Sequence, residues 1–167
     1  MPPGPGPLHL TLPLADTAAT EALGTAIAPL VGRGDVLLLA GPIGAGKTHF
    51  ARALIQSRLA AAGQAEEVPS PTFTLVQTYD AGGLAIIHAD LYRLPDRADL
   101  AELGLDEASE TALVLVEWPE RMHAPPPDAL TIGFGMDDAG RSRRADLSAR
   151  HPRWERVLAA LAAGWAR

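Results

Sequence analysis

The chain has 167 residues, of which 47% are hydrophobic and 20% charged, a length and composition that fit one ordinary globular domain. Twenty acidic against fourteen basic residues leave a net charge of −6. This argues against a domain that grips nucleic acid by bulk electrostatics, because neutralising phosphates takes clustered lysine and arginine. The absence of cysteine excludes disulfides, thiolate metal sites and cysteine nucleophiles.

The sequence gives no sign of a membrane segment. No apolar run approaches the roughly 20 residues that span a bilayer. The opening residues, MPPGPGPLHL, lack the positive and apolar regions of a signal peptide. We therefore expect a cytoplasmic protein. Residues 1–7 are rich in proline and glycine and are expected to be disordered, and residues 8–167 are expected to form a single domain.

Strand and helix patterns alternate along the chain. Continuous apolar runs at 36–40 and 112–116 are typical of strands buried on both faces. Apolar periodicity predicts a helix at about 17–31, capped by Asp16 or Thr17. The other expected elements are a strand at 8–12, a helix at 47–61, strands at 72–79 and 84–89 joined by a turn at 80–83, an irregular helix at 96–110, strands at 129–136 and 143–149 paired as an edge hairpin, and a helix at 151–166. This order predicts an α/β fold with a mixed, mostly parallel central sheet flanked by helices, an antiparallel C-terminal hairpin and a terminal helix.

Residues 41–48, GPIGAGKT, match the phosphate-binding pattern G-x-x-x-x-G-K-[ST] at every fixed position, after an apolar strand and before a helix. Glycines let successive backbone N–H groups point at phosphate oxygens, and the helix N-terminus adds partial positive charge. Lys47, the only lysine among the fourteen basic residues, would reach the β- and γ-phosphates, and the Thr48 hydroxyl would coordinate Mg²⁺. The pattern predicts nucleotide binding in a P-loop NTPase-like sandwich. No base-reading NKxD motif is present to separate ATP from GTP.

A P-loop enzyme needs a carboxylate at the end of a neighbouring strand to hold Mg²⁺ or its waters. Asp90 and Glu117 each end a predicted strand. Ligands bind beyond the carboxyl ends of strands in open α/β sheets, so both side chains are expected to face the phosphates. A helix cap or a solvated loop position is the alternative for each. Residues 70–74, SPTFT, are either a segment that senses the γ-phosphate or a turn entering a strand.

Taken together, these pieces resemble the TsaE family, also called YjeE. The resemblance covers residues 12–150 and rests on four motifs in order, GPIGAGKTHF, SPTFTLVQTY, HADLYRL and LVEWPER. TsaE is the small bacterial P-loop ATPase of tRNA threonylcarbamoyladenosine biosynthesis. The resemblance implies ATP or ADP with Mg²⁺ as ligands, and weak ATPase activity in a complex with TsaD and TsaB. That complex modifies adenosine 37 of ANN-decoding tRNAs. TsaE is not itself the transferase, so contact with tRNA would be indirect.

The resemblance also implies roles residue by residue. The nucleotide would be bound by Thr17, Gly44, Ala45, Gly46, Lys47, Thr48 and His49, with a helix cap as the structural alternative for Thr17. Thr48 and Glu117 correspond to the Mg²⁺ positions. Lys47, Asp90 and Glu117 correspond to the catalytic ones, with Asp90 ordering water or metal. His49 stands where the family usually has threonine or serine.

A small-molecule kinase, acting on a nucleoside or a sugar, is the alternative function for the same loop. Such enzymes usually need a lid with several arginines for the phosphate acceptor. Arg141, Arg143 and Arg144 could imitate one, but they lie far along the chain in the predicted hairpin. A nucleotide-gated binding module without useful turnover is a third reading. Trp118 is expected either near the nucleotide or partner or in the core, and Tyr92 on the partner surface or bracing Asp90.

Overall fold

The computed structural model describes residues 6–71, 75–97, 99, 101–136 and 142–165. Among them, one seven-stranded sheet has the order β1-β7-β6-β2-β5-β4-β3. Its strands are β1 (Leu8–Leu14), β2 (Val36–Ala40), β3 (Val76–Ala81), β4 (Leu84–Asp90), β5 (Leu113–Glu117), β6 (Leu130–Met136) and β7 (Arg143–Ala149). The central strands β6, β2, β5 and β4 are mutually parallel, and β1–β7, β6–β7 and β3–β4 pair antiparallel at the margins. The predicted mixed α/β fold is confirmed.

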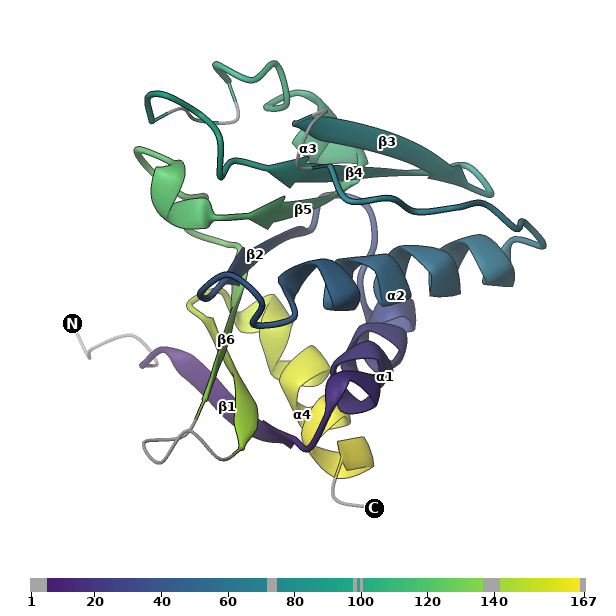
Figure 1. Cartoon of the computed structure of the whole chain (residues 1–167), viewed down its shortest axis with the longest axis vertical. Coiled ribbons are helices and arrows are strands. Elements are labelled where there is room, and N and C mark those ends of the chain that lie inside the picture. The colour runs from purple at the N-terminus through teal and green to yellow at the C-terminus, as the bar shows by residue number, and fades with distance from the viewer. Residues whose placement is uncertain (1–5, 72–74, 98, 100, 137–141, 166–167) are drawn as a thin grey trace.

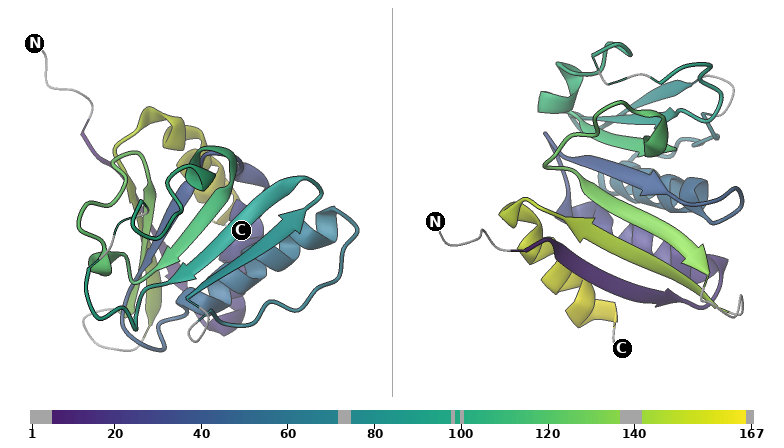
Figure 2. Two further views of the ribbon diagram at one scale, coloured as in Figure 1. Left: turned by 90° about the horizontal axis from the view of Figure 1, so that it is seen from above. Right: turned by 90° about the vertical axis from the view of Figure 1, so that its left-hand side faces the viewer.

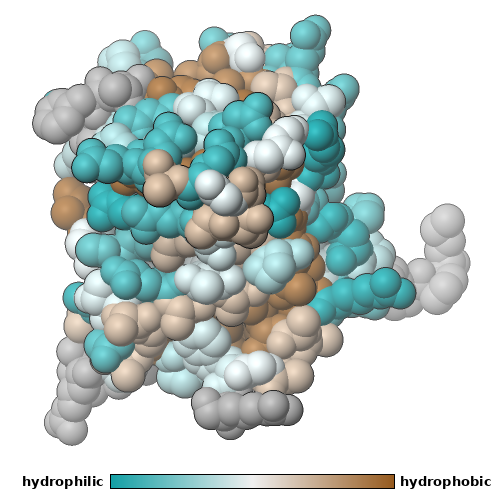
Figure 3. Space-filling model, turned by 90° about the vertical axis from the view of Figure 1, so that its right-hand side faces the viewer, coloured by the Kyte–Doolittle hydropathy of each residue, from teal (hydrophilic) through white to brown (hydrophobic). Residues whose placement is uncertain are grey.

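The three longer helices, α1 (Thr17–Ile27), α2 (Lys47–Ala61) and α4 (Glu155–Trp165), lie on one face of this sheet (Figures 1 and 2). Short 3-10 turns η1 (Ala28–Leu30), η2 (Pro119–Arg121) and η3 (Pro152–Trp154) and the four-residue α3 (Ala108–Thr111) complete the regular structure of the described residues. Hydrophilic side chains cover much of the surface seen in Figure 3, with hydrophobic ones gathered in strips between them. No helix within the described ranges has the length and apolar character that a membrane crossing requires.

The central strands are buried on both faces, as their unbroken apolar runs predict. In β2, Leu37 and Leu39 pack in the cluster beneath the helices, whereas Val36 and Leu38 pack in the cluster on the opposite face. That second face is covered by the segments that follow β4 and β5, which contribute Leu105 and other apolar side chains. The sheet therefore carries a core on each side.

The prediction of a helix at 96–110 is wrong. The described residues of this stretch form turns, and regular helix is limited to α3. Gly104 has φ +73°, a left-handed conformation that ends a right-handed helix, and Leu105 turns inward to the sheet. Covering the second face of the sheet takes precedence here over local helix propensity. Residues 98 and 100 lie outside the described residues.

The predicted hairpin at 129–136 and 143–149 forms, as β6 and β7, but it is not at the edge of the sheet. Strand β1 pairs with the whole of β7, from Leu8 opposite Ala149 to Leu14 opposite Arg143, and is itself the edge strand. It is also two residues longer than the sequence predicts. The pairing places Arg143 beside the N-terminal end of α1.

The remaining boundaries differ by a few residues. Helix α2 has the predicted bounds, whereas α1 ends at Ile27 and continues as η1, which contains a proline. Strand β3 starts at Val76 and extends through Ala81, so the turn to β4 is Gly82-Gly83. The predictions for residues 1–5, 72–74 and 166 lie outside the described residues, as does the tip of the hairpin at 137–141.

The C-terminal segment is tied to the sheet by its two residues before α4. Trp154 is fully buried, and its indole N–H donates to the carbonyl of Asp128 at 2.7 Å. Arg153 donates through both terminal nitrogens to the Asp35 carboxylate, each at 2.8 Å. Burial raises the pKa of Asp35, and the hydrogen bond from Gly32 and the charge of Arg153 oppose that rise.

Candidate nucleotide-binding site

A pocket of about 440 Å³ lies at the carboxyl ends of β2, β4 and β5. This is where open parallel sheets bind ligands. All nine residues that the sequence predicts for the site line it: Thr17, Gly44, Ala45, Gly46, Lys47, Thr48, His49, Asp90 and Glu117. The structure therefore brings together residues that are up to 100 positions apart, and their individual roles stay predictions.

The phosphate-binding loop connects β2 to α2 through left-handed glycines. Gly44 has φ +78° and Gly46, the N-cap of α2, has φ +111°. Gly46 has no side chain that could accept from the first N–H groups of α2. The N–H groups of the first helical turn lack intrahelical partners, so they are left for a ligand.

Lys47 is held inside the loop. Its side chain is buried, and Nζ donates to the carbonyl of Gly41 and, at 3.3 Å, to that of Pro42. The ammonium also lies 3.5 Å from the centre of the Trp118 ring, a cation–π contact. Burial lowers the pKa of Lys47, and the nearby carboxylates of Glu117, Glu120 and Asp90 oppose that change. A partly desolvated ammonium attracts an anion more strongly than one in water.

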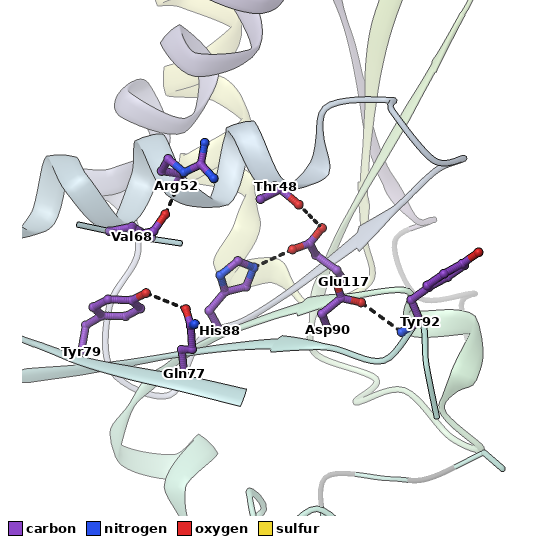
Figure 4. A network of polar contacts seen from close by, with 9 residues as sticks. All are labelled: Thr48, Arg52, Val68, Gln77, Tyr79, His88, Asp90, Tyr92 and Glu117. Carbon is purple, nitrogen blue, oxygen red and sulfur yellow. Dashed lines mark hydrogen bonds and ion pairs between the residues drawn. The ribbon is translucent and has the colours of Figure 1, made fainter. Parts of the chain in front are cut away.

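A chain of polar contacts links α2 to β5 and β4 (Figure 4). The Thr48 hydroxyl donates to Glu117 Oε1 at 2.8 Å, and Glu117 Oε2 lies 2.7 Å from His88 Nε2. Glu117 is 1% exposed and His88 is fully buried. His88 was not among the residues predicted from the sequence. The feature that could have indicated His88 is its position as a titratable residue inside an apolar strand. It lies two positions before Asp90 and therefore on the same face of β4.

Asp90 lies directly opposite Glu117 in the register of β4 and β5, and is also buried. Its Oδ1 accepts from the backbone N–H of Tyr92 at 3.0 Å, so the carboxylate closes a turn and the helix-cap alternative is not formed. The cap alternative for Thr17 is also not formed, because Asp16 Oδ1 accepts from Ala19 N at 2.8 Å and is itself the cap of α1.

The family model described as Threonylcarbamoyl adenosine biosynthesis protein TsaE matches residues 14–145, well over half of the chain. The chain belongs to the TsaE family. This confirms the family that the four motifs indicated.

Individual relatives agree with that membership. A Nostoc protein named tRNA threonylcarbamoyladenosine biosynthesis protein TsaE is 35% identical over 140 residues, covering 81% of this chain and 83% of the relative. A Rickettsia conorii protein of the same name is 42% identical over 101 residues, covering 60% of this chain and 56% of the relative. The match to the Rickettsia protein thus spans little more than half of that protein. The crystal structure of Bacillus subtilis YdiB has a TM-score of 0.73 at 27% identity, covering 96% of this chain and 99% of that one.

Four further residues complete the pocket of this TsaE-family chain: Ile43, Tyr92, Trp118 and Arg143. Trp118 has φ +62°, and its ring lies 4.8 Å from that of Tyr92. Trp118 lines the pocket and also packs, partly buried, against the core on the second face of the sheet, so each of the two expected places is observed in part. Arg143 lies at the start of β7, between β6 and β1, so its distance along the sequence does not keep it from the site. Arg144 instead contacts Asp146 at 3.0 Å, and Arg141 lies outside the described residues.

The donor set of the pocket fits Mg²⁺ only in company with a polyphosphate. Within the described ranges, no three histidine, cysteine, aspartate or glutamate side chains gather as a metal cage. Thr48 and Glu117 supply one hydroxyl and one carboxylate 2.8 Å apart. Mg²⁺ is commonly held by one or two such groups together with substrate phosphates and waters. The residues present therefore fit a metal that arrives with its nucleotide.

Proposed function

We propose that this chain binds ATP with Mg²⁺ and hydrolyses it slowly, as the ATPase subunit required to form the threonylcarbamoyl modification of adenosine 37 in ANN-decoding tRNAs. The proposal is carried by one observation above others. The phosphate-binding loop opens into the pocket where Glu117, a buried carboxylate, lies 2.8 Å from the hydroxyl of Thr48. The names of the relatives support the pathway, and family membership supports the use of ATP.

In this proposal, the backbone of residues 44–49 binds the phosphates. The left-handed glycines turn the loop so that its N–H groups and the N-terminus of α2 face one anion. Lys47 places its ammonium against the β- and γ-phosphates, exchanging its bonds with neutral loop carbonyls for bonds to charged phosphate oxygens. Thr17 and His49 border the same space from α1 and α2 and contact the rest of the nucleotide.

Thr48 and Glu117 would hold Mg²⁺, which neutralises phosphate charge when bound. Asp90, opposite Glu117 on the neighbouring strand, accepts a hydrogen bond from the attacking water and so orients it toward the γ-phosphate. Hydrolysis breaks the bond between the γ-phosphorus and its bridging oxygen and releases phosphate and ADP. The slow rate in this proposal comes from the family resemblance.

The partners in this proposal are homologues of TsaD and TsaB, and they come from the family resemblance. TsaD would transfer the threonylcarbamoyl group, while this chain supplies nucleotide-driven cycling of the complex. The net charge of −6 favours indirect contact with tRNA, through the partners. We further propose a cytoplasmic location and a single domain over residues 8–167.

The test measures phosphate release from ATP, first with the purified chain alone and then with TsaB and TsaD homologues added. We expect slow release that the partners stimulate, and loss of both rates in Lys47→Ala. Equal rates with and without partners would refute the role in a complex. The presence of Arg143 on the pocket wall favours including the kinase alternative in the same assay. ATP consumption that depends on an added nucleoside or sugar would establish that alternative instead.

A further inference from the structure

His88 is a fully buried histidine that the proposed function leaves without a task. It stands in the middle of β4, in the sequence LAIIHAD, where its neighbours are apolar. The only polar group that it contacts among the described residues is Glu117, at 2.7 Å. A buried polar side chain lowers stability unless it is hydrogen-bonded, so this pair calls for a physical reason.

The contacts of the ring determine where its proton lies. Glu117 already accepts from Thr48 through Oε1, and an ionised carboxylate accepts at its second oxygen as well. His88 Nε2 is therefore the donor. Nδ1 is buried and has no partner within the part of the chain that the structure describes. A buried N–H without an acceptor is costly, so the ring is the neutral tautomer with its hydrogen on Nε2.

We infer that His88 is a positioning residue for the Glu117 carboxylate. Its N–H fixes Oε2, so that Oε1 stays directed at Thr48, where the metal of the nucleotide would be held. A glutamate side chain has several rotatable bonds, and two hydrogen bonds on opposite oxygens select one orientation of the carboxylate (Figure 4). This inference rests on the proposed function, since it assigns Glu117 to the metal.

A neutral donor suits this position better than a cation would. An arginine or lysine beside Glu117 would offset the negative charge that attracts the metal. A neutral imidazole orients the carboxylate and leaves that charge in place. The pairing of β4 with β5 sets the geometry, because Asp90 lies opposite Glu117 and His88 is two residues earlier on the same face. The imidazole thus reaches Glu117 from within the sheet, away from the pocket.

Two substitutions separate the hydrogen bond from the bulk of the ring. In His88→Gln, the amide nitrogen can occupy the place of Nε2 and donate to Glu117. In His88→Asn, the shorter side chain places its amide near the position of Nδ1, out of reach of Glu117. The control is Tyr79→Phe, which removes a hydroxyl that donates to Gln77 at 2.8 Å on the adjacent strand β3, with no contact to Glu117.

The readout is the ratio of ADP affinities measured by calorimetry with Mg²⁺ and with EDTA. Loss of a hydrogen-bonded partner behind a metal ligand typically costs about 10–100-fold in metal affinity. We expect His88→Asn to reduce the Mg²⁺-dependent gain by about 10-fold or more, and His88→Gln and Tyr79→Phe to keep it within about 3-fold. An unchanged gain in His88→Asn, or equal losses in the asparagine and glutamine variants, would overturn the inference.

A measurement on the unsubstituted protein keeps the inference falsifiable if the variants do not fold. Long-range nitrogen–proton NMR correlations of the ring identify its tautomer. A proton on Nε2 alone is expected, and a proton on Nδ1 would overturn the assignment. If the wild-type protein binds no nucleotide in either buffer, the proposed function fails. If it binds with the expected Mg²⁺ gain and His88→Asn matches it, the positioning role alone fails.

Discussion

Replacing Gly46 by alanine tests whether the stability of the fold depends on both the loop conformation and its packing on α1. Gly46 has φ +111° and ψ +9°, a backbone state that costs a residue with a side chain about 1–3 kcal/mol. A Cβ at this position would also lie 3.1 Å from Cγ2 of Thr20, which is 1% exposed and cannot move into solvent. Overpacking of this kind adds about 1–3 kcal/mol. We therefore expect Gly46→Ala to lower the free energy of unfolding by about 2–6 kcal/mol.

Gly44 is the matched control. It is also left-handed, at φ +78°, but no described atom lies within 4 Å of the Cβ that alanine would add. Gly44→Ala should therefore cost only the backbone term, about 1–2 kcal/mol. The difference between the two variants combines the contact with Thr20 and the difference between the two backbone conformations. Urea unfolding without nucleotide, followed by circular dichroism, measures both, and an unchanged slope in urea shows that only stability differs.

The double variant Gly46→Ala/Thr20→Ser makes the comparison decisive. Serine lacks Cγ2, so it removes the methyl group that the new Cβ would meet. In the wild-type background Thr20→Ser should cost about 1 kcal/mol for the lost buried methyl. In the Gly46→Ala background it should cost nothing or restore stability, a coupling of about 1 kcal/mol or more. Equal stabilities for Gly44→Ala and Gly46→Ala, or additive effects of the two substitutions, would refute this account of the loop.

Substituting three other side chains separates phosphate binding, metal dependence and stability. Burial lowers the pKa of Lys47, so its ammonium loses its proton at a pH below 10.5, the ordinary lysine value. The ATP affinity of the wild-type protein, measured by calorimetry, should therefore fall as the pH rises toward that value. Lys47→Met should bind ATP weakly at every pH. Over the same window the unfolded chain binds more protons than the folded one, so the unfolding free energy of wild type should rise with pH relative to Lys47→Met. Glu117→Ala should abolish phosphate release and the effect of Mg²⁺ on nucleotide affinity, with Glu120→Ala as the active control; full Mg²⁺-dependent hydrolysis in Glu117→Ala would contradict the metal assignment. Trp154→Ala should lower the urea-unfolding free energy by about 3–5 kcal/mol yet leave ATP affinity within about 3-fold, because Trp154 does not line the pocket; a large loss of affinity in folded protein would count against that separation.

Much of the site could be predicted from the sequence because its chemistry is local or lies at strand ends. The loop at 41–48 carries its own signature, since the order of glycines, lysine and threonine sets both backbone shape and charge. Asp90 and Glu117 could be placed because each follows an apolar run, and parallel strands present such positions at one edge of the sheet. Boundaries that depend on local signals, such as those of α2, were also predictable.

What the sequence did not indicate depends on which strands become neighbours. Arg143 lies in β7, between β6 and β1, and no local pattern reveals that β1 pairs with β7. His88 acquires its partner only through the register of β4 with β5. The stretch from 96 to 110 has residues that favour a helix, but Leu103 and Leu105 instead pack against the second face of the sheet. In each case the outcome depends on a tertiary contact that local sequence patterns do not predict.

Calorimetric titration of Mg²⁺–ATP into the wild-type chain and into Lys47→Ala most directly tests the central claim, that the loop at 41–48 and its lysine bind a polyphosphate. The wild-type protein is predicted to bind one nucleotide per chain with measurable heat, and folded Lys47→Ala to give none at the same concentrations. Absence of binding by folded wild-type protein, or equal binding by both, would contradict the account.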